Sequence, residues 1–193
     1  MENLFRVDDI KVDMPSKVLS DNVAKIAVIG VGGGGCNMIN YMIEEGTHMI
    51  DLIVANTDLK VLHISKAPKK IELGPMLTNG FGAGMDPEVG RNSALESYDE
   101  IKETLKGADI ILNPAMWGIK RKEHYETISK ALALVNQSFV IASNSANDNM
   151  AKGSAIISPF GNIIKDDNKT ILEAKFDKDE ILKVRKYIDI GLN

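Results

Sequence analysis

Cysteine is almost absent from this chain, which has one, Cys36, in 193 residues. An internal disulfide is therefore excluded, and we expect a protein of the reducing cytoplasm. Acidic residues outnumber basic ones and give a net charge of -4, so the positive surface that nucleic-acid binding requires is not indicated. No apolar run approaches the roughly 20 residues of a membrane span. The acidic N-terminus lacks the pattern of a secretory signal, and residues 1–24 are predicted to form a flexible tail.

The sequence shows no pattern for a metal site or for a phosphate loop that uses a lysine. His48, His63 and His124 share no metal-ligand spacing with one another or with Cys36. No Lys-Ser or Lys-Thr follows a glycine-rich loop, so the phosphate loop that uses a lysine is not predicted. The basic cluster at 120–122 is followed by acidic residues and is interpreted as a solvated helix face.

The stretch from 26 to 40 carries the strongest pattern, a β-branched run that ends in consecutive glycines and opens into a helical pattern. Gly30, Gly32 and Gly35 satisfy G-x-G-x-x-G in the context that the dinucleotide fingerprint requires. If the helix begins at Cys36 or Asn37, its unpaired N–H groups and dipole attract an anion. We expect a phosphate site, the alternative being a tight turn without a ligand. A valine at position 34 or 35 is expected to abolish phosphate binding and leave the fold largely intact.

Apolar runs alternate with helical patterns along most of the chain, which predicts right-handed crossovers and a parallel sheet. The expected strands lie at 25–31, 51–56, 70–73, 109–113 and 139–143, with a hairpin at 155–165 and a further strand at 170–176. The predicted fold class is α/β, a Rossmann-like, doubly wound, mainly parallel sheet with a C-terminal antiparallel β-hairpin and a terminal helix near 179–187. The strands at 26–31, 51–56, 109–113 and 139–143 are expected to be parallel and adjacent.

Helix boundaries and buried faces follow from the same patterns. After a short helix at 59–65, Asp86, Pro87 and Glu88 form a strong helix start. One apolar stripe follows as far as Gly107, at positions 89, 94, 98, 101 and 105. The helix at 121–137 is expected to bury positions 125, 128, 132 and 135. The strand before it is expected to stop at Pro114.

Three motifs in residues 25–112 resemble FtsZ, the tubulin-like GTPase family of bacterial cell division. They are the segments 29–37, 55–58 and 80–90, which occur in the family's order and spacing. The resemblance implies that GTP or GDP, with or without Mg2+, binds to residues of these segments. The candidate nucleotide-binding residues are Gly32, Gly33, Gly34, Gly35, Cys36, Asn37, Asn56, Thr57, Asp58, Gly82, Ala83 and Gly84. It also implies FtsZ protomers or further copies of this chain as partners. Cys36 stands where the family commonly has glycine, and Asp86 where it often has asparagine.

Residues from about 107 onward resemble instead the C-terminal part of the nitrilase, or carbon–nitrogen hydrolase, superfamily. The matching pieces include Gly107 to Pro114, Trp117 with Arg121 and His124, and 174–177. The chain is thus expected to be a chimera, 25–112 FtsZ-like and 113–193 nitrilase-like, packed into one domain. The tubulin signature loop, the acidic catalytic loop and the family's guanine-reading residues are absent. So are the Glu and Lys of nitrilase chemistry, and the one cysteine lies in the glycine segment.

Several functions remain open at this point. The first is an FtsZ-like nucleotide-binding protein with impaired hydrolysis, for which no catalytic residue is predicted. The others are a module that binds FtsZ protomers and a folded domain without activity. A nitrilase-type enzyme is improbable, because its nucleophile is missing. An NAD protein ranks low, because Asp58 follows the glycines at more than the usual spacing of about 20 residues.

Overall fold

The computed structural model describes residues 24–47 and 49–188. His48 and the tail predicted for residues 1–24, apart from Ala24, lie outside the described residues. The elements are, in chain order, β1 (Ile26–Val31), α1 (Gly32–Glu44), β2 (Asp51–Asn56), α2 (Leu59–Ile64), β3 (Lys69–Glu72), α3 (Pro75–Thr78), α4 (Pro87–Glu96), α5 (Tyr98–Leu105), β4 (Ile110–Ala115), a 3₁₀ turn (Ile119–Arg121), α6 (Lys122–Asn136), β5 (Phe139–Asn144), β6 (Ala155–Ile157), β7 (Ile163–Ile164) and α7 (Lys178–Tyr187).

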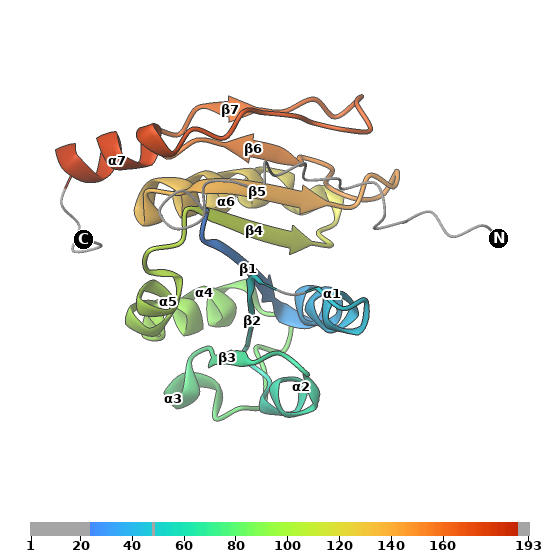
Figure 1. Ribbon diagram of the computed structural model, residues 1–193. Coiled ribbons are helices and arrows are strands. Elements are labelled where there is room, and N and C mark those ends of the chain that lie inside the picture. Colours follow the sequence, from blue (N-terminus) through green and yellow to red (C-terminus); the bar gives the residue numbers. More distant parts are fainter. Residues whose placement is uncertain (1–23, 48, 189–193) are drawn as a thin grey trace.

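The described strands form one seven-stranded sheet in the order β3-β2-β1-β4-β5-β6-β7 (Figure 1). The first five strands are parallel, and β6 and β7 run antiparallel at one edge. The sheet is continuous from β1 through β4 to β5, so the prediction that these strands are parallel and adjacent is confirmed. The predicted fold class is confirmed with it, including the hairpin and the terminal helix.

Helices cover both faces of the sheet, and strands β1 and β2 are accordingly buried along most of their length. Cys36 and Ile39 of α1 and Leu62 of α2 pack on one face. Leu105 of α5 and Tyr125 of α6 pack on the opposite face. The chain therefore turns from one face to the other between β1 and β4, which are neighbours in the sheet (Figure 1). A reversal of this kind is the place where doubly wound folds bind ligands, outside the carboxyl ends of the strands.

The apolar stripe expected between positions 89 and 105 is wrong in its detail. Ser97 separates two helices, α4 and α5, and Tyr98 is exposed. The Ser97 hydroxyl accepts a hydrogen bond from Gly74 N at 3.0 Å and donates one to Glu72 O at 2.9 Å. Ser93 is also buried, since Gly74 approaches it so closely that a Cβ there would lie 2.5 Å from Ser93. Small polar residues form this contact because the backbones are too close for large apolar side chains.

The buried face expected for α6 is wrong by about one residue. Tyr125 is buried and Leu132 packs against the core as predicted, but Ile128 and Val135 are 46% and 41% exposed. The face toward the sheet carries Tyr125 with Ser129, Ala133 and Asn136 instead. One residue turns a helix by about 100°, so a shift of one residue presents a different set of side chains to the sheet. The small side chains of Ser129 and Ala133 are buried there, although Ile128 and Val135 are more hydrophobic.

Two strand predictions also need correction. Pro114 lies inside β4, which continues to Ala115. Past Leu112, β4 pairs only with β5, and a proline without an N–H is tolerated where one side of a strand is unpaired. The strand expected at 170–176 is absent, and this described segment has no regular structure. The segment contacts the sheet through Phe176, whose ring centroid lies 5.2 Å from that of Phe139.

Candidate functional site

The turn from β1 into α1 contains the consecutive glycines. Gly32 has a φ of +70°, which favours glycine, and the helix begins at that residue. Gly30 and Gly35 touch each other, because a Cβ on Gly35 would lie 2.6 Å from the carbonyl carbon of Gly30. These two glycines let helix and strand pack closely. A side chain at Gly35 is therefore expected to disturb this packing, contrary to the expectation from the sequence.

The helix starts four residues earlier than Cys36, so its N-terminus is formed by the glycines themselves. The first N–H groups of a helix have no carbonyl partner within it. The N-cap residue of α1, Val31, makes no side-chain capping bond, and the first turn holds no acidic residue. Gly33 and Gly34 also lack the Cβ that would shield these groups. The start of α1 is thus an uncapped, electropositive surface made of main chain.

Cys36 lies behind this surface and not on it. Its side chain is 0% exposed and accepts a hydrogen bond from Asn56 Nδ2 at 3.7 Å. Burial raises the pKa of the Cys36 thiol, an effect that the bond from Asn56 partly offsets. Cys36 and Asn56, predicted as ligand-binding residues, are thus packed together inside the fold, whereas Asn37 is exposed on α1.

The other predicted residues meet beyond the end of β2. The Thr57 carbonyl accepts a hydrogen bond from Gly82 N at 3.0 Å, and the Thr57 hydroxyl accepts one from Ala83 N at 3.1 Å. Asp58 caps α2 by accepting a hydrogen bond from Lys60 N at 2.8 Å. The structure thus brings the segments 56–58 and 82–84 together, at the sheet edge that also carries the glycine turn. The hydrogen bonds of Thr57 and Asp58 at this edge therefore connect parts of the protein to one another.

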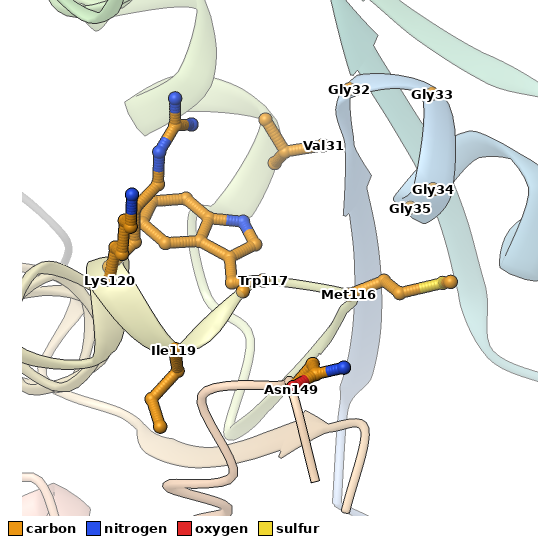
Figure 2. Close-up of a pocket in the computed structure, with 12 residues that line it drawn as sticks. Val31, Gly32, Gly33, Gly34, Gly35, Met116, Trp117, Ile119, Lys120 and Asn149 are labelled. Atoms are coloured by element: carbon orange, nitrogen blue, oxygen red, sulfur yellow. The ribbon is translucent and has the colours of Figure 1, made fainter. Parts of the chain in front are cut away.

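A pocket with a volume of about 530 Å³ opens in front of the glycine turn. Of the predicted residues it is lined by Gly32, Gly33, Gly34 and Gly35. Its opposite wall is the loop after β4, and Figure 2 shows Met116 of that loop directed toward the glycines. The remaining lining residues are Val31, Trp117, Gly118, Ile119, Lys120, Arg121 and Asn149. The pocket therefore lies between β1 and β4, where the chain changes faces.

The wall made by residues 116–121, which we call the β4 loop, is held by a buried amide. Asn144 Oδ1 accepts a hydrogen bond from Trp117 N at 2.8 Å, and its Nδ2 donates to the carbonyls of Trp117 and Lys152. The Trp117 ring packs on Tyr125 with 5.8 Å between centroids. Since Asn144 is 8% exposed, these bonds form away from water. These hydrogen bonds and the ring contact hold the β4 loop in place beside the pocket.

The pocket is cationic. Lys120 and Arg121 line it, and none of the described lining residues is acidic. Sequence reasoning assigned these cations to a solvated helix face and missed them as site residues. The position of the β4 loop in the chain could have identified them, because a parallel sheet places a loop that follows a strand at the same edge as the glycine turn. Asp86, which stands where the FtsZ family often has asparagine, caps α4 by accepting a hydrogen bond from Glu88 N at 2.8 Å.

Protein ligands for a metal ion are not evident here. Within 24–47 and 49–188, no three His, Cys, Asp or Glu side chains gather in a way that could hold a metal. Oxygen ligands are what Mg2+ prefers, and the described lining supplies no carboxylate. In the same ranges, none of the helices has the length and apolar character needed to cross a membrane.

The geometry defines a doubly wound α/β protein with an uncapped helix N-terminus at its switch point. Two family models match the chain. The Tubulin/FtsZ family, GTPase domain, matches residues 25–116, and the carbon-nitrogen hydrolases match residues 98–186. Each match spans less than half of the chain. The chain thus joins a Tubulin/FtsZ-type segment to a carbon-nitrogen-hydrolase-type segment, and the resemblance of each half is confirmed.

Several solved structures are similar to parts of this chain. An FtsZ variant from M. jannaschii is 40% identical over 49% of this chain and 29% of its own, with a TM-score of 0.47. Nit3 from Saccharomyces cerevisiae, a member of branch 10 of the nitrilase superfamily, is 21% identical over 55% and 38% of the two chains, with a TM-score of 0.40. CetZ from Methanosaeta thermophila is 15% identical over 66% and 38%, with a TM-score of 0.50, a likeness of fold. The chain spans less than two fifths of each of these proteins.

Proposed function

We propose that this protein binds the phosphates of a guanine nucleotide, GTP or GDP, in the pocket between the glycine turn and the β4 loop. The observation that carries the proposal is the uncapped N-terminus of α1, whose glycines face a pocket that contains two cations and no described carboxylate. A helix N-terminus offers free N–H donors and a positive dipole to a phosphate. The volume of about 530 Å³ suits a ligand of nucleotide size.

The match of residues 25–116 to the Tubulin/FtsZ GTPase domain supports a nucleotide as the source of that phosphate. It also supports a cytoplasmic protein connected with cell division, with FtsZ protomers or further copies of this chain as partners. Segments 56–58 and 82–84 are hydrogen-bonded to each other at the same edge of the sheet, outside the described lining of the pocket. Any Mg2+ would arrive on the nucleotide's phosphates, since the described lining offers it no carboxylate.

Hydrolysis is expected to be slow. Phosphoryl transfer depends on groups that position the water and stabilise charge. The tubulin signature loop and the acidic catalytic loop of the family are absent from the sequence, and the β4 loop stands where the signature loop is expected. Lys120 and Arg121 can neutralise charge, but no described lining residue can act as a carboxylate base.

Nitrilase chemistry is not supported, although residues 98–186 match the carbon-nitrogen hydrolases. The only cysteine in the sequence is Cys36, which is fully buried and has a raised pKa. A nucleophilic cysteine must be accessible and have a lowered pKa.

Calorimetric titration with GTP, GDP, ATP and NAD, with and without Mg2+, tests the proposal. The informative variant is Gly34→Ala, whose added methyl would lie 3.5 Å from Met116 Cβ, in the mouth of the pocket. It is expected to weaken nucleotide binding by about tenfold, which is 1.4 kcal/mol. The matched control is Gly90→Ala on α4, where the methyl meets nothing within 4 Å.

The control variant should bind like the parent protein. The proposal fails if no phosphate ligand binds the parent, or if Gly34→Ala and Gly90→Ala bind nucleotide equally well.

A further inference from the structure

The β4 loop determines which groups of a ligand the pocket is able to recognise. Three main-chain carbonyls already accept hydrogen bonds within the protein, two in this loop and one in the segment that bonds to it. They belong to Trp117, Gly118 and Asn149, and the bonds measure 2.7, 3.0 and 3.1 Å. A fourth, that of Ile119, accepts the N–H of Lys122. These bonds hold the loop together and occupy at least one of the two acceptor positions of each carbonyl, which reduces the acceptor capacity left for a ligand.

The side chains of the described lining residues offer few acceptors as well. Lys120 and Arg121 are donors only, and so is the indole of Trp117. Asn149 is the one described lining residue whose side chain has an acceptor oxygen, and it is exposed to water. A guanine base presents N–H donors together with the O6 and N7 acceptors, to which Lys120 and Arg121 could donate, whereas an adenine base presents an amino donor beside N7.

Strong discrimination between two such ligands requires buried polar groups that the wrong ligand leaves unpaired. Lys120, Arg121 and Asn149 are all exposed, and an exposed group does not impose this penalty because water replaces the missing partner. The side chains of the described lining residues therefore do not discriminate strongly between guanine and adenine.

Two other features of a nucleotide are well matched. The N–H groups at the start of α1 and the two cations attract phosphate oxygens. Met116 and Trp117 give an apolar and aromatic wall, and an aromatic ring stacks on any base because every base has a π-face. We infer that the pocket selects its ligand by the phosphate chain and stacks the base without identifying it, so that nucleoside triphosphates bind alike whichever purine they carry. This inference rests on the proposed function and extends the proposed ligand from guanine nucleotides to purine nucleotides in general.

The test uses Trp117, the only tryptophan in the sequence, whose ring lines the pocket. Its fluorescence therefore reports on this site in the unmodified protein. GTP, ATP, GMP and inorganic tripolyphosphate are titrated in turn, and calorimetry confirms each affinity. We expect GTP and ATP to bind within about threefold of each other, because discrimination would rest on exposed side chains only. Tripolyphosphate should compete with both, and GMP should bind at least about tenfold more weakly, since it lacks the phosphate chain.

Two variants separate the roles of the lining residues. The double change Lys120→Gln and Arg121→Gln is expected to weaken GTP, ATP and tripolyphosphate by the same factor, and by more at low salt than at high salt. Asn149→Ala should change the affinities for GTP and ATP by one common factor. Its fold should persist, because the bond that Asn149 contributes to the loop comes from its main-chain carbonyl.

The outcomes are distinguishable. If GTP binds more than tenfold tighter than ATP, and above all if Asn149→Ala removes that preference, the inference is wrong and the proposed function stands. GMP binding as tightly as GTP would also overturn the inference, because the base and sugar would then supply the affinity. If none of the four ligands binds, the proposed function fails and the inference fails with it.

Discussion

Gly35 offers a sharp test of how the glycine turn is built. In Gly35→Ala the new methyl carbon would lie 2.6 Å from the carbonyl carbon of Gly30 and 2.8 Å from its Cα. These backbone atoms belong to β1, a central strand paired with β2 on one side and β4 on the other. Neither partner can move aside without loss of sheet hydrogen bonds. The clash must therefore be relieved by moving α1 away from the sheet.

The expected cost follows from overpacking, which destabilises proteins by about 1–3 kcal/mol. For a chain of this length, 1 kcal/mol lowers the melting temperature by roughly 2–4 °C. Gly35→Ala should therefore lower it by about 2–12 °C. Gly33→Ala is the matched control in the same helical turn, because its methyl would meet nothing within 4 Å. It should leave the melting temperature unchanged or raise it slightly, since alanine favours the helix by up to about 1 kcal/mol.

Thermal unfolding followed by circular dichroism, with urea unfolding as a second measurement, compares the two variants with the parent. A lower midpoint for Gly35→Ala only would support the close contact between α1 and β1. Equal midpoints for Gly35→Ala and Gly33→Ala would refute it, and the glycine at 35 would then have no packing role.

Three other expectations follow from the described contacts. Because burial raises the pKa of the Cys36 thiol, a thiol reagent should modify the native protein far more slowly than the urea-unfolded chain, and equal rates would contradict this. Asn144→Ala leaves the Trp117 N–H unpaired and should cost about 1–3 kcal/mol in urea unfolding and shift the tryptophan emission; no change in either would show that the amide does not hold the loop. The hydrogen bond from Lys122 lowers the pKa of Asp167, so the pair stabilises the fold above the ordinary value of 3.8, and this contribution is lost as the pH falls through the lower folded-state pKa. Asp167→Asn should remove that part of the acid dependence of the urea midpoint, and an unaltered acid dependence would count against the pair.

The sheet was largely predictable because its signals are local. Asp51–Asn56 is an apolar run with a polar end, and its strand has the predicted bounds. Asp86 and Asp177 precede helices that begin one residue later, and both side chains accept capping bonds from main-chain N–H groups. The hairpin of β6 and β7 follows from a turn too short to join parallel strands. Each of these features depends on neighbours within a few residues.

Buried faces were less predictable, since they depend on the distance between backbones. Ser97 and Ser129 are buried, and Ile128 is not. A hydrophobicity pattern ranks these residues the other way. Close packing of helix and sheet admits small side chains, and the sequence contains no direct measure of that distance.

The sequence by itself determined that consecutive glycines join a strand to a helix and that the chain changes family resemblance near residue 110. Only the tertiary structure decided where the site lies. Ile26 pairs with Ile110 across 84 positions, and this pairing brings the β4 loop of one half opposite the glycine turn of the other. Lys120 and Arg121 become pocket residues through that contact alone. No local pattern encodes it, because the two walls meet through strand order and not through sequence neighbours.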